Sequence, residues 1–337
     1  MKKRLLKIFQ PLATKIPLEW LISISGQRLF LPFYHSVQNE VPLSHIQHLY
    51  PLRTVKNFEK DIDFLLKNYT PIDLRGLVDQ LKSGKPFEAN TFFLSFDDGL
   101  REVYDFIEPI LSKKGVPATI FLNAAFVDNR DLFFRYKASL LIDHLEKSKI
   151  SAATEKIIRQ RLGVPHIKQA ILKVNYQNRK VLDEIAEYLE ISFDDFLNQY
   201  QPYLSTEQIN RLLQKGYTFG SHSVDHPLYS DLTSTEQIRQ TKDSQYFINN
   251  NFPQDVKAFA FPFTDHGVPT SFFETIKKEQ LLDITFGTAG LKNDSTAFHL
   301  QRFPVEEFPF QIHEMVATEY FYYFGKSFLG KNRINRK

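Results

Sequence analysis

The stretch Phe92-Phe93-Leu94-Ser95-Phe96-Asp97-Asp98-Gly99 decides how the rest of the chain is interpreted. Its first part is a near-continuous apolar run, which is typical of a parallel strand covered on both faces. Two adjacent carboxylates and a glycine follow, at the carboxyl end of the strand, where α/β folds build their sites. Because neighbouring residues on an extended chain point in different directions, one carboxylate can bind a metal while the other faces a substrate. The alternative is a solvated turn, since Asp-Gly is a common turn pair.

Other short apolar segments are also predicted as buried strands, and helical patterns separate them. The strand segments are 29–34, 118–122, 217–219, 258–261 and 283–286. A capping box at Ser205–Gln208 opens one of the helices, and Gly216 closes it. Strands that alternate with helices favour a parallel α/β fold, either a barrel or an open sheet. Residues of about 135–203 break this alternation with consecutive helical patterns, which predicts a helical insertion.

Size and composition indicate a globular protein with a large core. The chain has 337 residues, of which 42% are hydrophobic and 24% charged, both ordinary values. A formal net charge of +3 does not suggest a nucleic-acid partner. The chain has no cysteine, so disulfides and thiolate metal sites are excluded and any metal must bind His, Asp or Glu.

Basic residues cluster at both ends of the chain, at 2–7 and 326–337. They are either solvated tails or a contact with a membrane surface or an acidic polymer. The N-terminus begins like a signal peptide, but Lys7, Gln10 and Lys15 interrupt the apolar run. Residues 18–34 are too broken to span a bilayer. We therefore expect a protein that is cytoplasmic or peripheral to a membrane.

The segment Gly220–Pro227 contains His222 and His226, four residues apart, after another short strand. Such a pair can bind one metal. With Asp98 it would form a set of two imidazoles and one carboxylate, which leaves positions open for water and substrate, as a catalytic zinc requires. The competing interpretation is a pair of surface histidines in a loop.

Two weaker motifs also lie at strand ends. In the segment 259–263, Pro262 fixes the backbone, so that the N–H of Phe263 could face a pocket. In the segment 32–36, His35 ends an aromatic strand, although a lone histidine there is more often structural.

Together these residues resemble the polysaccharide deacetylases of the NodB-homology type, carbohydrate esterase family four. Residues 95–99 match the Ser/Thr-Phe-Asp-Asp-Gly motif of that family, and His222 to His226 match its paired histidines. The segments 115–121 and 204–220 resemble the contexts of the two motifs. The resemblance covers about 30–305 apart from the insertion. The early Tyr34-His35 pair and the late segment 259–263 resemble the subgroup that includes poly-N-acetylglucosamine deacetylases.

The resemblance implies a deformed (β/α) barrel of about seven parallel strands and a divalent metal, usually Zn²⁺. It also implies roles for particular residues: Asp98, His222 and His226 as metal ligands, Asp97 as general base, the Phe263 N–H as oxyanion donor, and His35 as general acid. Pro262 supports the oxyanion loop, and His266 is the next candidate for the acid.

The chain departs from the family pattern at three places. Many members hold the catalytic base with an arginine where this chain has Ala260, and Arg302 is the nearby candidate to replace it. Thr264-Asp265-His266-Gly267 replaces the usual glycine after the Pro-aromatic pair. The tryptophan often found near the leaving group is missing, since Trp20 is the only tryptophan.

We therefore expect a basic N-terminal segment at 1–28, a deacetylase-like barrel at 29–305 and an aromatic, basic tail at 306–337. The insertion should flank the mouth of the site. The expected function is metal-dependent removal of N-acetyl groups from a glycan, while the oligomeric state is left open. Three alternatives remain: a sugar-binding protein that has lost turnover, an esterase for O-acetyl groups, and a membrane-tethered scaffold that uses the aromatic stretch 320–324.

Overall fold

The computed structural model describes residues 2–163, 166–306 and 310–336. Its centre is a sheet with the strand order β13-β11-β10-β9-β8-β7-β2-β14, in which all neighbouring strands are parallel. Their bounds are β2 Pro32–Tyr34, β7 Ser95–Phe96, β8 Thr119–Leu122, β9 Thr218–Ser221, β10 Ala258–Ala260, β11 Ile284–Gly287, β13 His299–Gln301 and β14 Phe303–Pro304.

The two edges of this sheet belong to one piece of chain, because only Arg302 separates β13 from β14. The segment pairs with β11 through its first part and with β2 through its second part. The sheet therefore returns to its own start and is nearly closed into a barrel. The eight strands come from seven segments of the chain, which confirms the predicted deformed barrel and its expected strand number.

The strands predicted at 29–34 and 92–96 are each divided in two. Their first halves, β1 (Leu29–Phe30) and β6 (Thr91–Phe92), form a separate three-stranded sheet with β5 (Thr70–Pro71). Their second halves join the barrel. Two further pairs are β3 (Val37–Gln38) with β4 (Arg53–Thr54), and β12 (Asn293–Asp294) with β15 (Arg333–Ile334).

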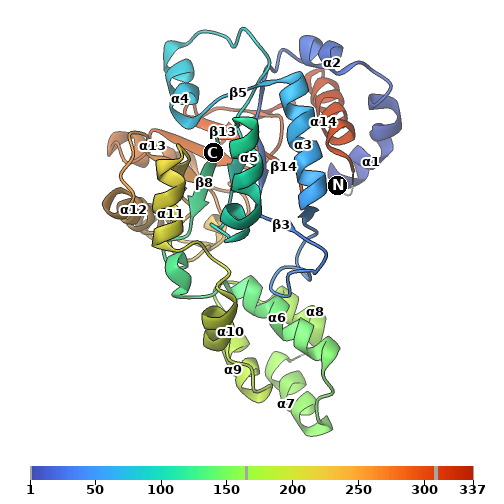
Figure 1. The fold of residues 1–337 in the computed structure, drawn as a ribbon, viewed down its shortest axis with the longest axis vertical. Coiled ribbons are helices and arrows are strands. Elements are labelled where there is room, and N and C mark those ends of the chain that lie inside the picture. Colours follow the sequence, from blue (N-terminus) through green and yellow to red (C-terminus); the bar gives the residue numbers. More distant parts are fainter. Residues whose placement is uncertain (1, 164–165, 307–309, 337) are drawn as a thin grey trace.

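Helices surround the barrel (Figure 1). Side-chain caps fix several of their starts: Thr54 and Thr233 accept from backbone N–H groups, and Ser205 and Gln208 form the predicted capping box. The helices are α3 Val55–Asn68, α4 Leu74–Ser83, α5 Glu108–Lys114, α11 Thr206–Gln214, α12 Ser234–Asn251 and α13 Thr270–Lys278. This part of the chain also contains a short π-helix at Val103–Ile107 and 3₁₀ turns at Val127–Asn129 and Tyr229–Asp231.

Aromatic rings fill the barrel interior. Phe93 stacks on Phe286 with ring centroids 5.2 Å apart. Gly220 must lack a side chain, because a Cβ there would come within 2.5 Å of the Phe121 ring. The guanidinium of Arg302 lies over the Phe33 ring at 4.3 Å from its centroid. A buried charge in such surroundings needs a partner of opposite charge. For Arg302 that partner is the carboxylate of Asp97.

Residues between β8 and β9 form the helices α6 Phe134–Lys147, α7 Ala152–Leu162, α8 Ile167–Lys173, α9 Val181–Tyr188 and α10 Phe193–Tyr200. They extend away from the barrel as a separate lobe (Figure 1). Leu141, Ile158 and Leu182 of the lobe belong to an apolar cluster that also contains Ile46, Leu100 and Phe126 from outside these helices. After α10 the chain returns to the barrel, where an isolated β-bridge joins Tyr203 to Leu100.

Of the C-terminal segment expected as an aromatic, basic tail at 306–337, the structure describes residues 306 and 310–336. The segment contains α14 (Ile312–Ser327), in which Met315, Val316 and Tyr320 are buried. This helix packs against α1 (Lys2–Ala13) and α2 (Leu18–Ser25). Its aromatic stretch is therefore largely used in packing rather than offered as a scaffold surface. Among the described residues, no helix has both the length and the apolar character needed to cross a bilayer.

Candidate metal centre and active site

The carboxyl ends of β7, β9 and β10 lead into loops with unusual backbone conformations. Asp98, Ser223, His226 and Phe263 have φ values of 70°, 69°, 61° and 57°. The left-handed region costs a non-glycine residue roughly 1 kcal/mol or more. Four such residues in the loops of one site indicate that the backbone is shaped there to direct side chains.

Asp98, His222 and His226 converge in a buried cluster. The Nε2 atoms of His226 and His222 lie 3.2 Å and 3.6 Å from Asp98 Oδ1. The ligand atoms of all three lie within 4.8 Å of one another. Burial lowers the pKa of His222 to about 4, so its imidazole is neutral, the form that binds metals.

The hydrogen bonds around this cluster fit a divalent cation. His222 Nδ1 lies 2.7 Å from the carbonyl oxygen of Ala260 and must donate to it, so the Nε2 lone pair faces Asp98. Asp98 Oδ2 accepts from the Tyr136 hydroxyl at 2.7 Å. Apart from the two imidazole nitrogens that face it, buried Asp98 Oδ1 has no polar partner in the described chain. A buried, unpartnered carboxylate oxygen facing two imidazole nitrogens is the environment that a bound cation satisfies.

A second group of metal-type donors is already neutralised. Asp265, Asp294 and His299 also lie close together. The guanidinium of Arg336, with only 3% of its side chain exposed, donates to both carboxylates. His299 Nε2 lies 3.0 Å from Asp265 Oδ2. Because an arginine supplies the positive charge, this group is a structural ion-pair cluster, and the first group is the candidate metal centre.

Asp97 is held by Arg302. Two guanidinium nitrogens donate to its two carboxylate oxygens at 2.7 Å and 2.8 Å. Burial alone would raise the pKa of Asp97, but the charge and hydrogen bonds of Arg302 outweigh it and hold that pKa below its usual range. The structure thus puts Arg302 where the sequence analysis suggested a replacement for the arginine missing at Ala260.

His35 is paired with Glu306, a residue that the sequence analysis missed. His35 Nδ1 lies 2.6 Å from Glu306 Oε2, and the same carboxylate accepts the backbone N–H groups of His35 and Ser36. Burial lowers the pKa of His35, but Glu306 outweighs that effect and the pKa rises to about 9. A signal was available: Glu306 follows β14 at the same carboxyl end as the other motifs.

Tyr136 and Tyr50 were also missed. Tyr136 lies in α6, the first helix of the insertion, and its hydroxyl is 3.2 Å from that of Tyr50. The Tyr50 ring lies 4.8 Å from the His35 ring. An aromatic residue within a helical pattern is normally a core residue, so only the folded arrangement reveals that the insertion reaches the candidate metal centre.

These residues surround one pocket of about 330 Å³. The exposed Phe263 ring lies 4.6 Å from the His226 ring and forms part of its wall. Neither Pro262, which is buried, nor His266, which is exposed, is part of the pocket lining. The lining residues are Phe33, His35, Leu49, Tyr50, Pro51, Asp97, Asp98, Phe133, Arg135, His222, His226, Phe261, Phe263, Thr288, Pro304 and Glu306.

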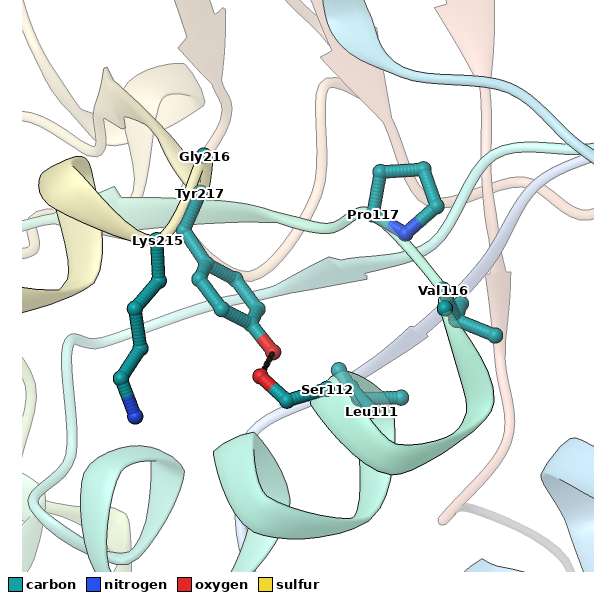
Figure 2. A pocket seen from close by; sticks show the side chains of 8 residues that line it. Leu111, Ser112, Val116, Pro117, Lys215, Gly216 and Tyr217 are labelled. Atoms are coloured by element: carbon teal, nitrogen blue, oxygen red, sulfur yellow. Dashed lines mark hydrogen bonds between the residues drawn. The ribbon is translucent and has the colours of Figure 1, made fainter.

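A hollow of about 290 Å³ lies elsewhere, between α5 and the turn before β9. Figure 2 shows the Tyr217 hydroxyl pointing at Ser112, with an oxygen–oxygen distance of 3.4 Å. Lys215 pairs with Glu108 at 2.8 Å. These polar groups satisfy one another, so this hollow has no chemistry comparable with that of the site.

Solved structures show the same fold at low sequence identity. The Streptococcus pyogenes deacetylase PplD in complex with acetate has a TM-score of 0.55 at 14% identity, covering 86% of this chain and 97% of that one. IcaB from Ammonifex degensii has a TM-score of 0.53 at 15% identity, covering 87% and 97%. A de-N-acetylase from Aggregatibacter actinomycetemcomitans has a TM-score of 0.53 at 13% identity, covering 86% and 99%.

A search of curated protein sequences gave no match. The family profile described as polysaccharide deacetylase matches residues 84–278, which is more than half of the chain. That range contains the Asp97–Asp98 pair and both histidines of the candidate metal centre. The resemblance seen in the sequence is thereby confirmed, and the chain belongs to the polysaccharide deacetylase family.

Proposed function

We propose that this protein is a metal-dependent hydrolase that removes N-acetyl groups from the amino sugars of a glycan. One observation supports the proposal most: a buried Asp-His-His cluster with an unpartnered carboxylate oxygen lies beside an arginine-held aspartate in one pocket. Membership of the polysaccharide deacetylase family supplies the class of substrate.

Asp98, His222 and His226 would hold the cation. Two imidazoles and one carboxylate with open positions favour Zn²⁺ over the harder Mg²⁺ or Ca²⁺. When bound, a divalent cation acidifies a water molecule and polarises an acetyl carbonyl. Tyr136 would fix the orientation of the Asp98 carboxylate from the opposite side, as partners of metal ligands commonly do.

Asp97 is the proposed general base. Its low pKa keeps it ionised at neutral pH, and the two hydrogen bonds from Arg302 hold the carboxylate in one orientation. In this role it removes the proton from the attacking water. The alternative of a sugar-binding protein without turnover was based on the missing arginine at position 260. Arg302 makes the contacts to Asp97 that such an arginine would make, which weakens that alternative.

His35 is the proposed general acid. The amine of an amide is a poor leaving group and must depart protonated. Because Glu306 raises its pKa to about 9, His35 is protonated at neutral pH and can donate that proton. The backbone N–H of Phe263 is the proposed oxyanion donor, a type of contact that is worth about 3 kcal/mol in other enzymes.

The aromatic walls of the pocket favour a sugar ring as the substrate, since Phe133, Phe263 and Tyr50 offer flat apolar faces. Among the neighbours in fold, one is described as a de-N-acetylase. A polymer of N-acetylglucosamine is the proposed substrate class, in keeping with the subgroup that the sequence motifs resemble. An O-acetyl esterase is the second candidate, because the same metal centre would serve either bond.

A comparison of two acetylated substrates tests the choice. Zinc-loaded protein should release acetate from N-acetylglucosamine oligomers faster than from O-acetylated xylo-oligomers, because a protonated His35 supplies the proton that an amine leaving group requires. His35→Ala should depress the N-acetyl reaction by roughly 10²-fold and the O-acetyl reaction much less. Equal losses on both substrates would favour a structural role for His35. If the protein prefers the O-acetyl substrate, the proposed N-deacetylase function is wrong and the O-acetyl esterase takes its place.

A further inference from the structure

The N-terminal helices α1 and α2, which both pack against α14, carry large apolar side chains that the fold leaves exposed. One face of α1 is used in packing: Leu6 and Ala13 are buried, and the Phe9 ring lies 5.8 Å from that of Phe321 in α14. Large apolar side chains also occur on the outer side. We define the N-terminal surface as the exposed residues Lys7, Ile8, Leu12, Lys15 and Trp20.

The large apolar side chains of this surface are more than half exposed to solvent. Ile8 is 61% exposed, Leu12 is 55% exposed and Trp20, on the neighbouring helix, is 54% exposed. Single exposed apolar residues are common in soluble proteins. Ile8 and Leu12, however, lie one turn apart on the same helix face. A helix that only covers a barrel would be polar on that face.

Charge indicates what the surface would contact. The first 28 residues contain six basic residues and a single acidic one, Glu19. Within the described side chains, Lys7 and Lys15 are exposed on either side of the Ile8–Leu12 face along the chain. Aliphatic residues flanked by lysines, with a tryptophan on the following helix, are the composition of segments that lie in a membrane interface. The lysines would contact anionic headgroups, and the apolar side chains would enter the acyl boundary.

We propose that this surface docks the protein peripherally on an anionic lipid membrane. A second copy of the chain is the competing occupant. In a two-fold dimer the same patch would meet itself, so the lysines of both copies would enter one interface and like charges would repel. An anionic membrane carries no such penalty. In Figure 1, α1 and α2 lie with α14 on one side of the barrel, separate from the helical lobe.

The position of Trp20 makes the proposal directly measurable, because it is the only tryptophan in the chain. Full-length protein would be mixed with vesicles of phosphatidylcholine alone or of phosphatidylcholine with phosphatidylglycerol in equal parts. We expect a blue shift of Trp20 emission and co-sedimentation with the anionic vesicles, weakened by added salt. We expect neither effect with the neutral vesicles. The assay requires no substrate or metal, so its outcome is independent of the proposed catalysis.

Three variants sharpen the test. The double variant Ile8→Glu with Leu12→Glu should bind at least about tenfold more weakly, and Lys7→Gln with Lys15→Gln should lose the preference for anionic lipid. Tyr246→Glu, at a 69% exposed site on α12, is the matched control and should bind like the original chain. Thermal melting of each variant checks that the fold is intact.

The proposal is overturned if anionic vesicles neither bind the protein nor shift Trp20 emission, or if Tyr246→Glu weakens binding as much as the double variant does. Binding without a change at Trp20 would also overturn it, because a different surface would then be in contact. If sedimentation equilibrium shows a dimer without lipid, and Trp20 emission is shifted to the blue in that dimer, the surface is assigned to a second copy instead.

Discussion

Replacing Glu306 by glutamine tests how the acid His35 is kept protonated. The substitution removes the negative charge but keeps an oxygen that can accept the backbone N–H groups of His35 and Ser36, so the loop should hold its shape. The side-chain amide would then donate to His35 Nδ1, which favours the neutral imidazole. We therefore expect the pKa of His35 to fall.

The size of the effect follows from the pKa of about 9 that Glu306 gives to His35, against an ordinary value of 6.5. The difference corresponds to roughly 3 kcal/mol of preference for the charged imidazole. At pH 7.5 His35 should be almost fully protonated in the original chain. In Glu306→Gln the protonated fraction should fall about tenfold if the pKa returns to the ordinary value.

The sign of the pH dependence follows directly. His35 gains a proton acceptor on folding, so its interaction with Glu306 is complete below the ordinary histidine pKa and is lost as pH rises through about 9. Activity that needs the protonated acid should follow the same course. A bound dication would lower this pKa in both proteins alike, so the difference between them is the informative quantity.

The assay is the pH profile of kcat for acetate release from N-acetylglucosamine oligomers. We expect the alkaline limb of Glu306→Gln to move about two pH units lower, while Glu306→Asp, which keeps the charge, should move less. Glu207→Gln, at an exposed surface glutamate, is the matched control. An unchanged alkaline limb in Glu306→Gln would refute the pairing of acid and carboxylate as the source of this pH dependence.

Three further substitutions give distinct outcomes. Asp97→Asn should lower kcat by roughly 10²-fold or more yet retain zinc by elemental analysis, and loss of zinc would make Asp97 a ligand instead. Tyr136→Phe should weaken zinc binding by about 10- to 100-fold in competition with a chelator, because Asp98 loses its hydrogen-bond donor. Arg336→Ala should lower the free energy of unfolding, measured by urea titration, by roughly 3 kcal/mol, because Asp265 and Asp294 lose their buried partner. An unchanged free energy of unfolding would show that these ion pairs contribute little to stability.

The barrel was predictable because its strands are short, apolar and regularly separated by helices. The continuous run before Asp97 is the clearest case: it marks a buried parallel strand and also points to the end where sites occur. What the pattern could not give is the division of strands 29–34 and 92–96 between two sheets. That division depends on which neighbours each half meets, and apolar periodicity does not encode neighbours.

Residues of the candidate site were predictable where a motif marked them and not where long-range contacts bring them in. The cluster of Asp98, His222 and His226 followed from residue types and spacing. Arg302 was named only as a possible replacement for a missing arginine, since nothing local shows that it reaches Asp97, 205 positions away. Tyr136 gave no signal because an aromatic in a helix is usually a packing residue.

The C-terminal helix illustrates a different limit. A stretch such as 320–324, aromatic and followed by basic residues, looks like an interaction surface in isolation. In the fold, Tyr320 and Tyr323 are buried, and α14 packs against the two N-terminal helices. The partners come from the opposite end of the chain, so composition alone could not distinguish a packed helix from an exposed tail.

Zinc titration of the metal-stripped protein tests the proposed reaction most directly. Acetate release from N-acetylglucosamine oligomers should be absent in the stripped protein and should rise with added zinc until one equivalent per chain is bound. The reason is that, among the described residues, one Asp-His-His cluster has a carboxylate oxygen that a cation would satisfy. His226→Ala should show no such rise. Full activity in the stripped protein, or the same zinc response in His226→Ala, would contradict the assignment of this cluster as the catalytic metal centre.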